Sequence, residues 1–526
     1  MRIGFSSIYS WRPHVEHLEF LAEMARRAGH ETFYLTCDAD FPTCYTRELR
    51  PDRSEWIHCA RCRIGGVRSY TDRNVRSVGS LLADAPISTV DASAWALSSA
   101  STLGRFESDV DFASDDFRFL AARLEPTARA GFAAAKRWIE REELDAIFVF
   151  NGRMDATRGI LEAGRVAGIR SISVERTWFG DGLQLIPDEN CLGLKEIGRL
   201  VAEWRDRPLN RLQAFRAASH VALRFLGRNS KEWRAYNTGA QVTPWPIVGS
   251  TRRILLTPGS QNEVWSHPDW SCEWPDRLAA FDAVIGQLNL RPGDVILRCH
   301  PNWGENIGSK SGRLAEEYYT DWAKRRGIYT IASRDLTSTL GLIEHSDAIV
   351  VGGGSAALEA AIIGKQVIAV SPSVYCNAGF QSTVESAEQL KALSLVVDES
   401  REVRQIIEAR TSKQALRFCY TMAYRVAQFV DHVRCQSTTK YRYRFDADPR
   451  RLAALINTGR LAADDADFDS NDAAEEEILA LIRERLWDQL ANLVGASSSA
   501  PLQPIRRRWR YRVIDRIRAA FPRGDL

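Results

Sequence analysis

The sequence has no uncharged apolar run of the roughly 18 residues that a membrane-spanning helix needs. A strand candidate, Arg2–Phe5, follows Met1 directly, so the charged and apolar regions of a secretory signal are missing. Because both segments are missing, we expect a cytoplasmic protein. The formal net charge of +3 over 526 residues says little about partners, since the last twenty residues hold much of the positive charge. No nucleic-acid partner is expected.

The chain also lacks an Asp-x-Asp pair at a strand end that would clearly hold a divalent cation. Asp38 and Asp40 have that spacing, but they lie among cysteines in an expected loop. This absence favours chemistry without a catalytic metal.

Cysteine, in contrast, is plentiful, with ten residues. In a reducing compartment these thiols are expected to be free or bound to metal. The pair Cys59 and Cys62 has the spacing of half a zinc knuckle, whereas the six residues between Cys37 and Cys44 make a looser pair. A structural zinc site at these four residues and four ordinary reduced thiols both remain open.

The length and composition predict a globular protein of about two to four domains. Strand and helix signals alternate twice, which predicts α/β architecture with two Rossmann-like domains. The first domain is expected at 1–237 and the second at 251–435, joined by a linker rich in proline and glycine. Residues 436–526 are expected to form a helical and acidic extension. Strands are predicted at 3–6, 32–36, 146–150, 171–174, 254–257, 295–297, 328–331, 348–351 and 367–370.

Residues 347–359, Asp-Ala-Ile-Val-Val-Gly-Gly-Gly-Ser-Ala-Ala-Leu-Glu, carry the most informative pattern of the chain. A buried strand runs into three glycines, which permit a tight turn and let a ligand approach the backbone. Ser355 can cap a short helix whose first N–H groups offer a seat for a phosphate. Glu359 lies one turn further on the same face, placed to accept hydrogen bonds from a ribose. The alternative is a glycine-rich turn that serves packing alone. The pattern predicts a nucleotide-sugar site at Gly353, Gly354, Ser355 and Glu359.

A second polar group, Arg298-Cys299-His300-Pro301, follows the strand at 295–297. Because parallel strands end at one edge of their sheet, we expect His300 to meet the glycine turn. An imidazole there can donate to a departing phosphate oxygen, whereas the alternative is a loop histidine that caps a carbonyl. Arg298 alternates with His300 and can face the same cleft. Lys310 is interpreted as a solvated loop lysine.

Four segments resemble the GT-B glycosyltransferases, and among them the bacterial capsular polysaccharide biosynthesis type: Phe150–Arg153, Thr257–Glu263, Arg298–Asn302 and 335–370. The resemblance covers about residues 1–435 and depends on the order and spacing of the motifs. It implies two Rossmann-like domains facing a cleft, with a nucleotide-sugar donor held by the second domain and its phosphate held by His300. It also implies that Ser260 and Gln261 face the donor. Gly259 and Gln261 depart from the serine-like and glutamate-like residues of the family, which puts those contacts in doubt.

The base that activates the acceptor is expected from the first domain, within hydrogen-bond reach of the attacking hydroxyl. His14 at a helix start and Glu175 at the end of a buried strand are the favoured candidates, and Asp155 and Asp181 are the others. Helix capping would explain His14 and Asp155, and a turn would explain Asp181. Arg153 can either clamp an anionic group or pair with Glu175.

Residues 505–521 have an apolar residue at every fourth position and arginine at most of the others. This pattern predicts a basic amphipathic helix that can lie on anionic lipid at the inner face of the membrane. Such a helix could instead cover the protein's own surface or bind nucleic acid.

Together these features predict transfer of a sugar from a nucleotide-sugar to a growing surface or capsular polysaccharide, or to a glycolipid. A nucleotide-sugar 2-epimerase and a glycerophosphotransferase are alternatives of the same fold. A non-catalytic scaffold that binds a membrane or nucleic acid is the alternative of a different class.

Overall fold

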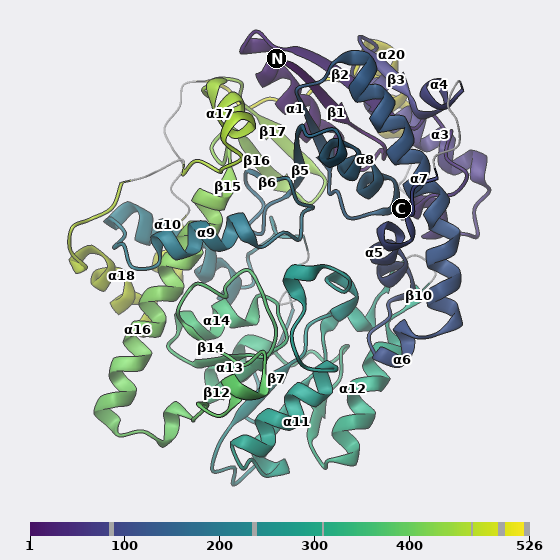
Figure 1. The fold of residues 1–526 in the computed structure, drawn as a ribbon. Coiled ribbons are helices and arrows are strands. Elements are labelled where there is room, and N and C mark those ends of the chain that lie inside the picture. Colours follow the sequence, from purple (N-terminus) through teal and green to yellow (C-terminus); the bar gives the residue numbers. More distant parts are fainter. Residues whose placement is uncertain (84–88, 234–238, 308–309, 464–466, 493–499, 520–526) are drawn as a thin grey trace.

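The computed structural model describes residues 1–83, 89–233, 239–307, 310–463, 467–492 and 500–519. Two α/β domains lie one above the other, with the amino-terminal domain at the top of Figure 1 and the second domain below it. Within the described ranges, no helix is both long and apolar enough to cross a membrane.

The first domain is built on a seven-stranded sheet in the order β15-β6-β5-β4-β1-β2-β3. Neighbouring strands from β3 to β5 in this order are parallel, whereas β6 is antiparallel to both β5 and β15. Strand β4 is apolar and buried along its whole length, as expected for a central strand covered on both faces. The strands are β1 (Arg2–Ser6), β2 (Glu31–Thr36), β3 (Val75–Ser77), β4 (Ala146–Phe150), β5 (Arg170–Arg176), β6 (Leu183–Pro187) and β15 (Ala427–Gln428).

The second domain has a six-stranded sheet in the order β11-β8-β7-β12-β13-β14, and every neighbouring pair is parallel. Strands β7, β8 and β12 are buried throughout. The chain adds β8 on one side of β7 and β12 on the other, so the strand order reverses at β7. Open parallel sheets bind ligands at such a switch point. The strands are β7 (Ile254–Thr257), β8 (Val295–Arg298), β11 (Tyr329–Ile331), β12 (Ala348–Val351), β13 (Gln366–Ala369) and β14 (Gln381–Thr383).

Helices flank both sheets. In the first domain the main ones are α1 (His14–Arg27), α5 (Ser93–Gly104), α7 (Asp115–Glu142), α8 (Asp155–Val166), α9 (Lys195–Trp204) and α10 (Arg211–Phe225). In the second they are α11 (Arg277–Gln287), α12 (Arg313–Arg325), α13 (Thr339–His345), α14 (Ala356–Ile362) and α16 (Arg401–Tyr420). The predicted fold class is confirmed: the chain has the GT-B arrangement of two Rossmann-like domains, followed by a largely helical carboxyl-terminal region.

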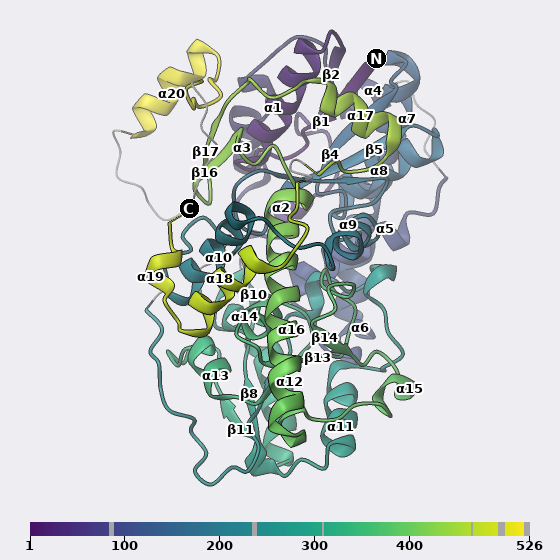
Figure 2. The same cartoon turned by 90° about the vertical axis from the view of Figure 1, so that its left-hand side faces the viewer.

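The chain returns to the first domain earlier than the boundary predicted at 435. Helix α16 runs upward along the second domain in Figure 2, and a π-helical turn, Thr421–Val426, leads into β15. Because β15 pairs with β6, residues 427–428 already belong to the first sheet. A hairpin, β16 (Val433–Ser437) and β17 (Lys440–Tyr443), follows on that domain. The later helices are α17 (Arg450–Thr458), α18 (Ala473–Arg483), α19 (Trp487–Leu490) and α20 (Trp509–Ala519).

Candidate functional site

A pocket of about 480 Å³ opens at the switch point of the second sheet. The ends of β7, β8 and β12 supply its floor and sides, and Asn229 and Glu232 from the segment after α10 add to its lining. Six of the eight residues predicted to bind the donor line this single pocket: Arg298, His300, Gly353, Gly354, Ser355 and Glu359.

The glycine turn after β12 has two different structural requirements. Gly353 and Gly354 have φ values of +114° and +94°, and a side chain there would be strained although nothing lies within 4 Å of an added Cβ. Gly352 has no such φ, but a Cβ would come within 2.1 Å of the Pro258 carbonyl oxygen. The turn therefore keeps open space over Gly353 and Gly354 on the pocket side.

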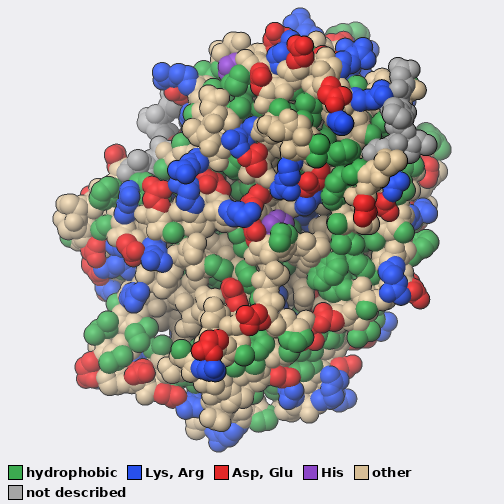
Figure 3. All heavy atoms as spheres, in the orientation of Figure 1, with side chains coloured by type: hydrophobic (Ala, Val, Ile, Leu, Met, Phe, Trp, Pro, Cys, Tyr) green, Lys and Arg blue, Asp and Glu red, His purple; other side chains and the backbone are tan. Residues whose placement is uncertain are grey.

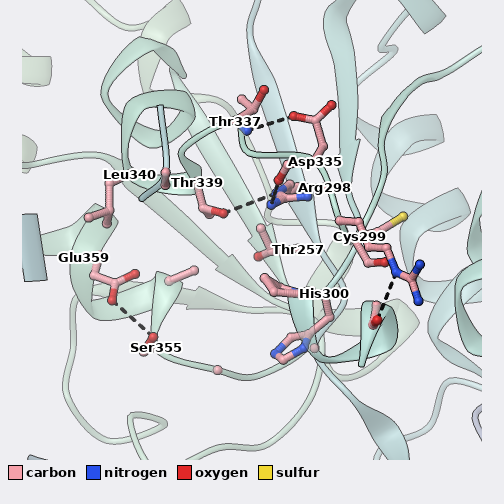
Figure 4. Close-up of a pocket in the computed structure, with 18 of the residues that line it drawn as sticks. Thr257, Arg298, Cys299, His300, Asp335, Thr337, Thr339, Leu340, Ser355 and Glu359 are labelled. Atoms are coloured by element: carbon pink, nitrogen blue, oxygen red, sulfur yellow. Dashed lines mark hydrogen bonds between the residues drawn. The ribbon is translucent and has the colours of Figure 1, made fainter. Parts of the chain in front are cut away.

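Ser355 does not cap α14 as predicted. It has helical φ and ψ, and its hydroxyl donates to Oε1 of Glu359 at 3.1 Å. Arg224 of α10 donates to the same oxygen, also at 3.1 Å, and to Glu232 at 2.8 Å. Figure 4 shows the second carboxylate oxygen of Glu359 turned away from Ser355.

Burial and Arg224 act in opposite directions on the Glu359 carboxyl. Burial raises the pKa of Glu359, and the nearby guanidinium of Arg224 acts in the opposite direction by stabilising the carboxylate. Since Oε1 already accepts two hydrogen bonds, a ribose hydroxyl would have to reach Oε2. Sequence reasoning missed Arg224, because nothing in its helix marks it as a partner of a residue 135 positions away.

His300 lies beside the loop that leads to Ser355 (Figure 4). Its Nδ1 accepts a hydrogen bond from the backbone N–H of Asn302 at 3.2 Å, so in the neutral ring the proton is on Nε2. Burial lowers the pKa of His300, and the Glu263 carboxylate partly offsets that effect. A neutral imidazole with its N–H on Nε2 is a hydrogen-bond donor suited to a phosphate oxygen.

Arg298 lines the pocket, but its guanidinium serves the neighbouring loop. It donates to the carbonyl oxygens of Ala332 and Asp335, and burial lowers its pKa. These bonds hold the loop after β11, which forms a polar wall of the pocket. The loop contributes Ser333, Arg334, Asp335, Leu336 and Thr337 to the lining, and the first turn of α13 contributes Thr339 and Leu340. A cluster of serine, threonine and aspartate directly after a strand is the signal that could have found this wall.

Ser260 and Gln261 lie outside the described lining of this pocket. The Ser260 hydroxyl contacts Asn302 and accepts from the indole of Trp303, while the Gln261 backbone N–H donates to Glu107 at 2.7 Å. Both residues therefore hold loops together in this structure. The doubt raised by their departure from the family pattern is consistent with these contacts.

Residues 101–107 of the first domain form hydrogen bonds with the loops that line the pocket. Glu107 is buried and accepts hydrogen bonds from Gln261, Asn262 and Tyr319. Arg105 donates to the carbonyl oxygens of Asn302 and Glu305, which follow His300. The position of the pocket loops is thus tied to the first domain.

In the first domain, His14 and Glu175 lie together. Their Nε2 and Oε1 atoms are 3.6 Å apart, and the His14 ring packs against Phe150 at 4.1 Å between centroids. Burial lowers the pKa of His14, with Glu175 acting to raise it. Glu175 also accepts from the Asn151 side chain at 2.7 Å, so it can orient the imidazole. The described lining of the 480 Å³ pocket includes neither residue.

The two other candidate bases have structural partners. Asp155 is fully buried and accepts from the Tyr9 hydroxyl at 2.5 Å and the Tyr45 N–H at 2.9 Å. Asp181 accepts from Lys231 at 2.8 Å and from the Cys435 N–H at 2.7 Å. In this conformation neither carboxylate is presented to an open site.

Arg153 donates to the hydroxyls of Ser98 and Thr102, at 2.9 and 3.0 Å. Both hydroxyls are on α5, so neither of the two roles considered for Arg153, an anion clamp or a partner of Glu175, describes its contacts.

Of the two interpretations left open for the four cysteines, the structure does not support the zinc site. Cys37 follows β2, Cys44 precedes α2 (Tyr45–Glu48), and Cys59 and Cys62 are on α3 (Glu55–Gly65). No group of three or more His, Cys, Asp or Glu side chains in the described part of the chain could hold a metal ion. Burial raises the pKa of Cys37 to about 11 and of Cys44 to about 12, which favours neutral thiols over the thiolates that zinc binds.

The basic tail is helical over Trp509–Ala519, and the predicted end of the helix at Phe521 lies outside the described residues. Arg507 anchors it to the first domain, because this buried guanidinium donates to the Ser69 hydroxyl at 3.0 Å. Trp509 is 72% exposed and Val513 is 45% exposed. The side chains of Trp509 and Val513 are therefore open to solvent, whereas Ile505, which precedes the helix, packs against the core.

No protein-family model and no curated protein matches the chain. Among solved structures, it is similar to KpsC of Thermosulfurimonas dismutans, a β-Kdo 2,4-transferase, with 14% identity over 66% of this chain and 88% of that one, and a TM-score of 0.30. The UDP-GlcNAc 2-epimerase of Methanocaldococcus jannaschii, solved with UDP-GlcNAc and UDP, has 10% identity over 87% and 99% of the two chains and a TM-score of 0.29. MurG of Acinetobacter baumannii has 12% identity over 79% and 94%, and a TM-score of 0.26. With TM-scores below 0.5, the function has to be inferred from this chain's own residues.

Proposed function

We propose that the protein is a glycosyltransferase that moves a sugar from a nucleotide-sugar to a surface polysaccharide, capsular polysaccharide or glycolipid acceptor. The observation that carries this proposal is the convergence of His300 and the open glycine turn on one pocket at the switch point of a parallel sheet. A diphosphate fits between backbone N–H groups of the turn and the Nε2–H of a neutral imidazole.

In the proposed reaction, a hydroxyl oxygen of the acceptor forms the new bond to the anomeric carbon while the bond to the nucleotide's phosphate oxygen breaks. His300 donates a hydrogen bond to the departing diphosphate, and the turn at Gly353 and Gly354 holds its oxygens. The hydroxyl proton goes to His14, whose lowered pKa keeps the ring neutral and able to accept it. Glu175 then stabilises the imidazolium. The pocket of about 480 Å³ is called the donor pocket from here on. Transfer requires His14 of the first domain and the donor pocket to come together around the bound substrates.

The test is a thermal-shift screen of nucleoside diphosphates and nucleotide-sugars on the wild type, His300→Ala and Ser355→Trp. A bound ligand raises the melting temperature by mass action, and both variants should lose most of that rise. Ser394→Trp is a matched control, because Ser394 is exposed on the same domain and outside the pocket. No shift for the wild type with any nucleotide would overturn the proposal.

The two enzymatic alternatives are separated by products. A transferase releases free nucleoside diphosphate in proportion to acceptor glycan, and His14→Ala should slow that release without lowering nucleotide affinity. A 2-epimerase inverts the configuration at C2 of the sugar in its nucleotide-sugar and needs no acceptor. A glycerophosphotransferase transfers a phosphoglycerol group. Either of those products from the wild type would replace the present proposal.

Peripheral attachment to the inner face of the membrane is part of the proposal. It is supported by the exposed Trp509 and Val513 beside the arginines of α20. Sedimentation with vesicles containing phosphatidylglycerol should retain the wild type and lose Trp509→Ala, whereas neutral vesicles should retain neither. Equal binding to both kinds of vesicle would contradict attachment by charge.

A further inference from the structure

A second cavity, of about 390 Å³, lies next to the donor pocket. Most of its lining comes from residues 264–277, between β7 and α11. The linings of the two cavities come near each other along the chain at one place and through a hydrogen bond at another. Gln261 lines this cavity while Gly259 lines the donor pocket, and the hydroxyl of Ser371 in this cavity donates to the carbonyl of Gly352, at 3.1 Å.

Three tryptophans within residues 265–274 line this cavity, and all three are half-buried. The indole N–H of Trp270 donates to the Leu192 carbonyl at 2.8 Å, and that of Trp274 donates to the Val384 carbonyl at 2.7 Å. Trp265 stacks on Phe112 with ring centroids 4.1 Å apart. These bonds and contacts hold the rings in place, so the cavity has rigid aromatic walls before any ligand arrives.

The polar side of the cavity is built around Arg277. This side chain is only 8% exposed and donates to the Ser371 hydroxyl at 2.6 Å. Its Nε atom is buried and has no hydrogen-bond partner among the described residues. Leaving a buried donor unpaired is unfavourable, and a ligand oxygen at this edge would remove that cost. Asp109 and Asp276 provide acceptors on the same lining.

Fixed indoles and a few polar groups match one ligand class best. A pyranose ring presents an apolar C–H face, which packs on an indole, and a rim of hydroxyls that both donate and accept. The two carboxylates outnumber the one guanidinium, which disfavours an acidic ligand. A nucleotide would need a binding site for its phosphates. The glycine turn that offers one opens into the donor pocket. Figure 3 shows hydrophobic side chains gathered on this face of the molecule at the height of α5 and α6 (Asp109–Phe112).

We infer that this cavity is a subsite for a neutral saccharide unit of the acceptor glycan, remote from the unit that reacts. The inference rests on the proposed transferase function, which requires a second substrate beside the donor. Such a subsite would increase affinity for a longer acceptor without touching the reacting atoms.

The experiment measures binding of neutral oligosaccharides, namely glucan, galactan and mannan pentasaccharides, by saturation-transfer NMR and titration calorimetry. The wild type is compared with Trp270→Ala and Trp270→Phe, and Trp56→Ala is the control because Trp56 is 72% exposed on the first domain. We expect Trp270→Ala to lose about tenfold or more in affinity, with Trp270→Phe and Trp56→Ala retaining most of it. Melting temperatures with and without UDP report folding and the donor pocket independently.

The outcomes separate the two claims. Saccharide binding that depends on Trp270, in a protein that no nucleotide stabilises, would keep the subsite and overturn the transferase. A nucleotide response without binding of any of the pentasaccharides at millimolar concentration would overturn the subsite alone. Loss of UDP binding in a folded Trp270→Ala variant would also overturn it, by assigning the cavity to the donor.

Discussion

Glu107 gives the sharpest test of how the two domains are joined. Its carboxylate crosses from the first domain to accept hydrogen bonds from the Gln261 backbone, the Asn262 side chain and the Tyr319 hydroxyl, all in the second. It is 1% exposed, and burial raises its pKa from the usual 4.5 to about 7, while the Gln261 N–H acts to lower it. The folded protein therefore holds a proton here that the unfolded chain releases near pH 4.5.

The sign of the pH effect follows from this difference. Between pH 4.5 and 7 the folded state binds more protons than the unfolded state, so stability falls as pH rises. The full difference corresponds to about 3 kcal/mol, and between pH 5 and pH 8 it is about 2–3 kcal/mol. Glu107→Gln cannot titrate, and the Asn262 amide can reverse to pair with it. The variant should lack this part of the pH dependence.

Urea unfolding at pH 5 and pH 8 gives the change in the free energy of unfolding between the two pH values for the wild type and for Glu107→Gln. The effect is the difference between these two changes. The free energy of unfolding of the wild type should fall by about 2–3 kcal/mol more than that of the variant. Glu399→Gln, at an exposed glutamate of the second domain, should follow the wild type. Parallel changes in the wild type and Glu107→Gln would refute the assignment of a buried, protonated carboxyl to the domain interface.

Two further predictions test the donor pocket. Arg224→Met removes the cation between Glu232 and Glu359, and should lower the free energy of unfolding by about 3–5 kcal/mol, with partial recovery in the Arg224→Met, Glu359→Gln double variant. Urea titrations measure this loss of stability. An Arg224→Met variant as stable as the wild type would refute the pairing of Arg224 with the two glutamates. Gly353→Ala should cost about 1–2 kcal/mol from its φ of +114°, whereas Gly293→Ala, where space is equally open and φ is not positive, should cost nothing. Equal melting temperatures for the two glycine variants would contradict the strained turn.

Much of the fold follows from short patterns. Strand β4 and strand β12 are continuous apolar runs bounded by polar or glycine residues, and such runs are typical of buried parallel strands wherever they occur. Because the carboxyl ends of parallel strands share one edge, the meeting of His300 with the glycine turn could also be predicted. Strands β3, β6 and β14 were missed, since each is short or lies toward a sheet edge, where periodicity is weak.

The cysteine pattern shows why spacing alone is an incomplete argument. A zinc site needs thiolates converging in space, and the spacing of Cys59 and Cys62 says only that they are one helical turn apart. Capping by Ser355 was predicted from residue type, but the hydroxyl has a carboxylate partner that competes with the helix N–H groups.

By itself, the sequence determined two Rossmann-like domains and the glycine turn, because burial patterns and backbone freedom are encoded in neighbouring residues. The tertiary structure alone decided that Arg224 meets Glu359, that Glu107 joins the domains, and that three tryptophans border one cavity. Those contacts depend on how whole domains pack, and the residues on each side look ordinary until the chain brings them together.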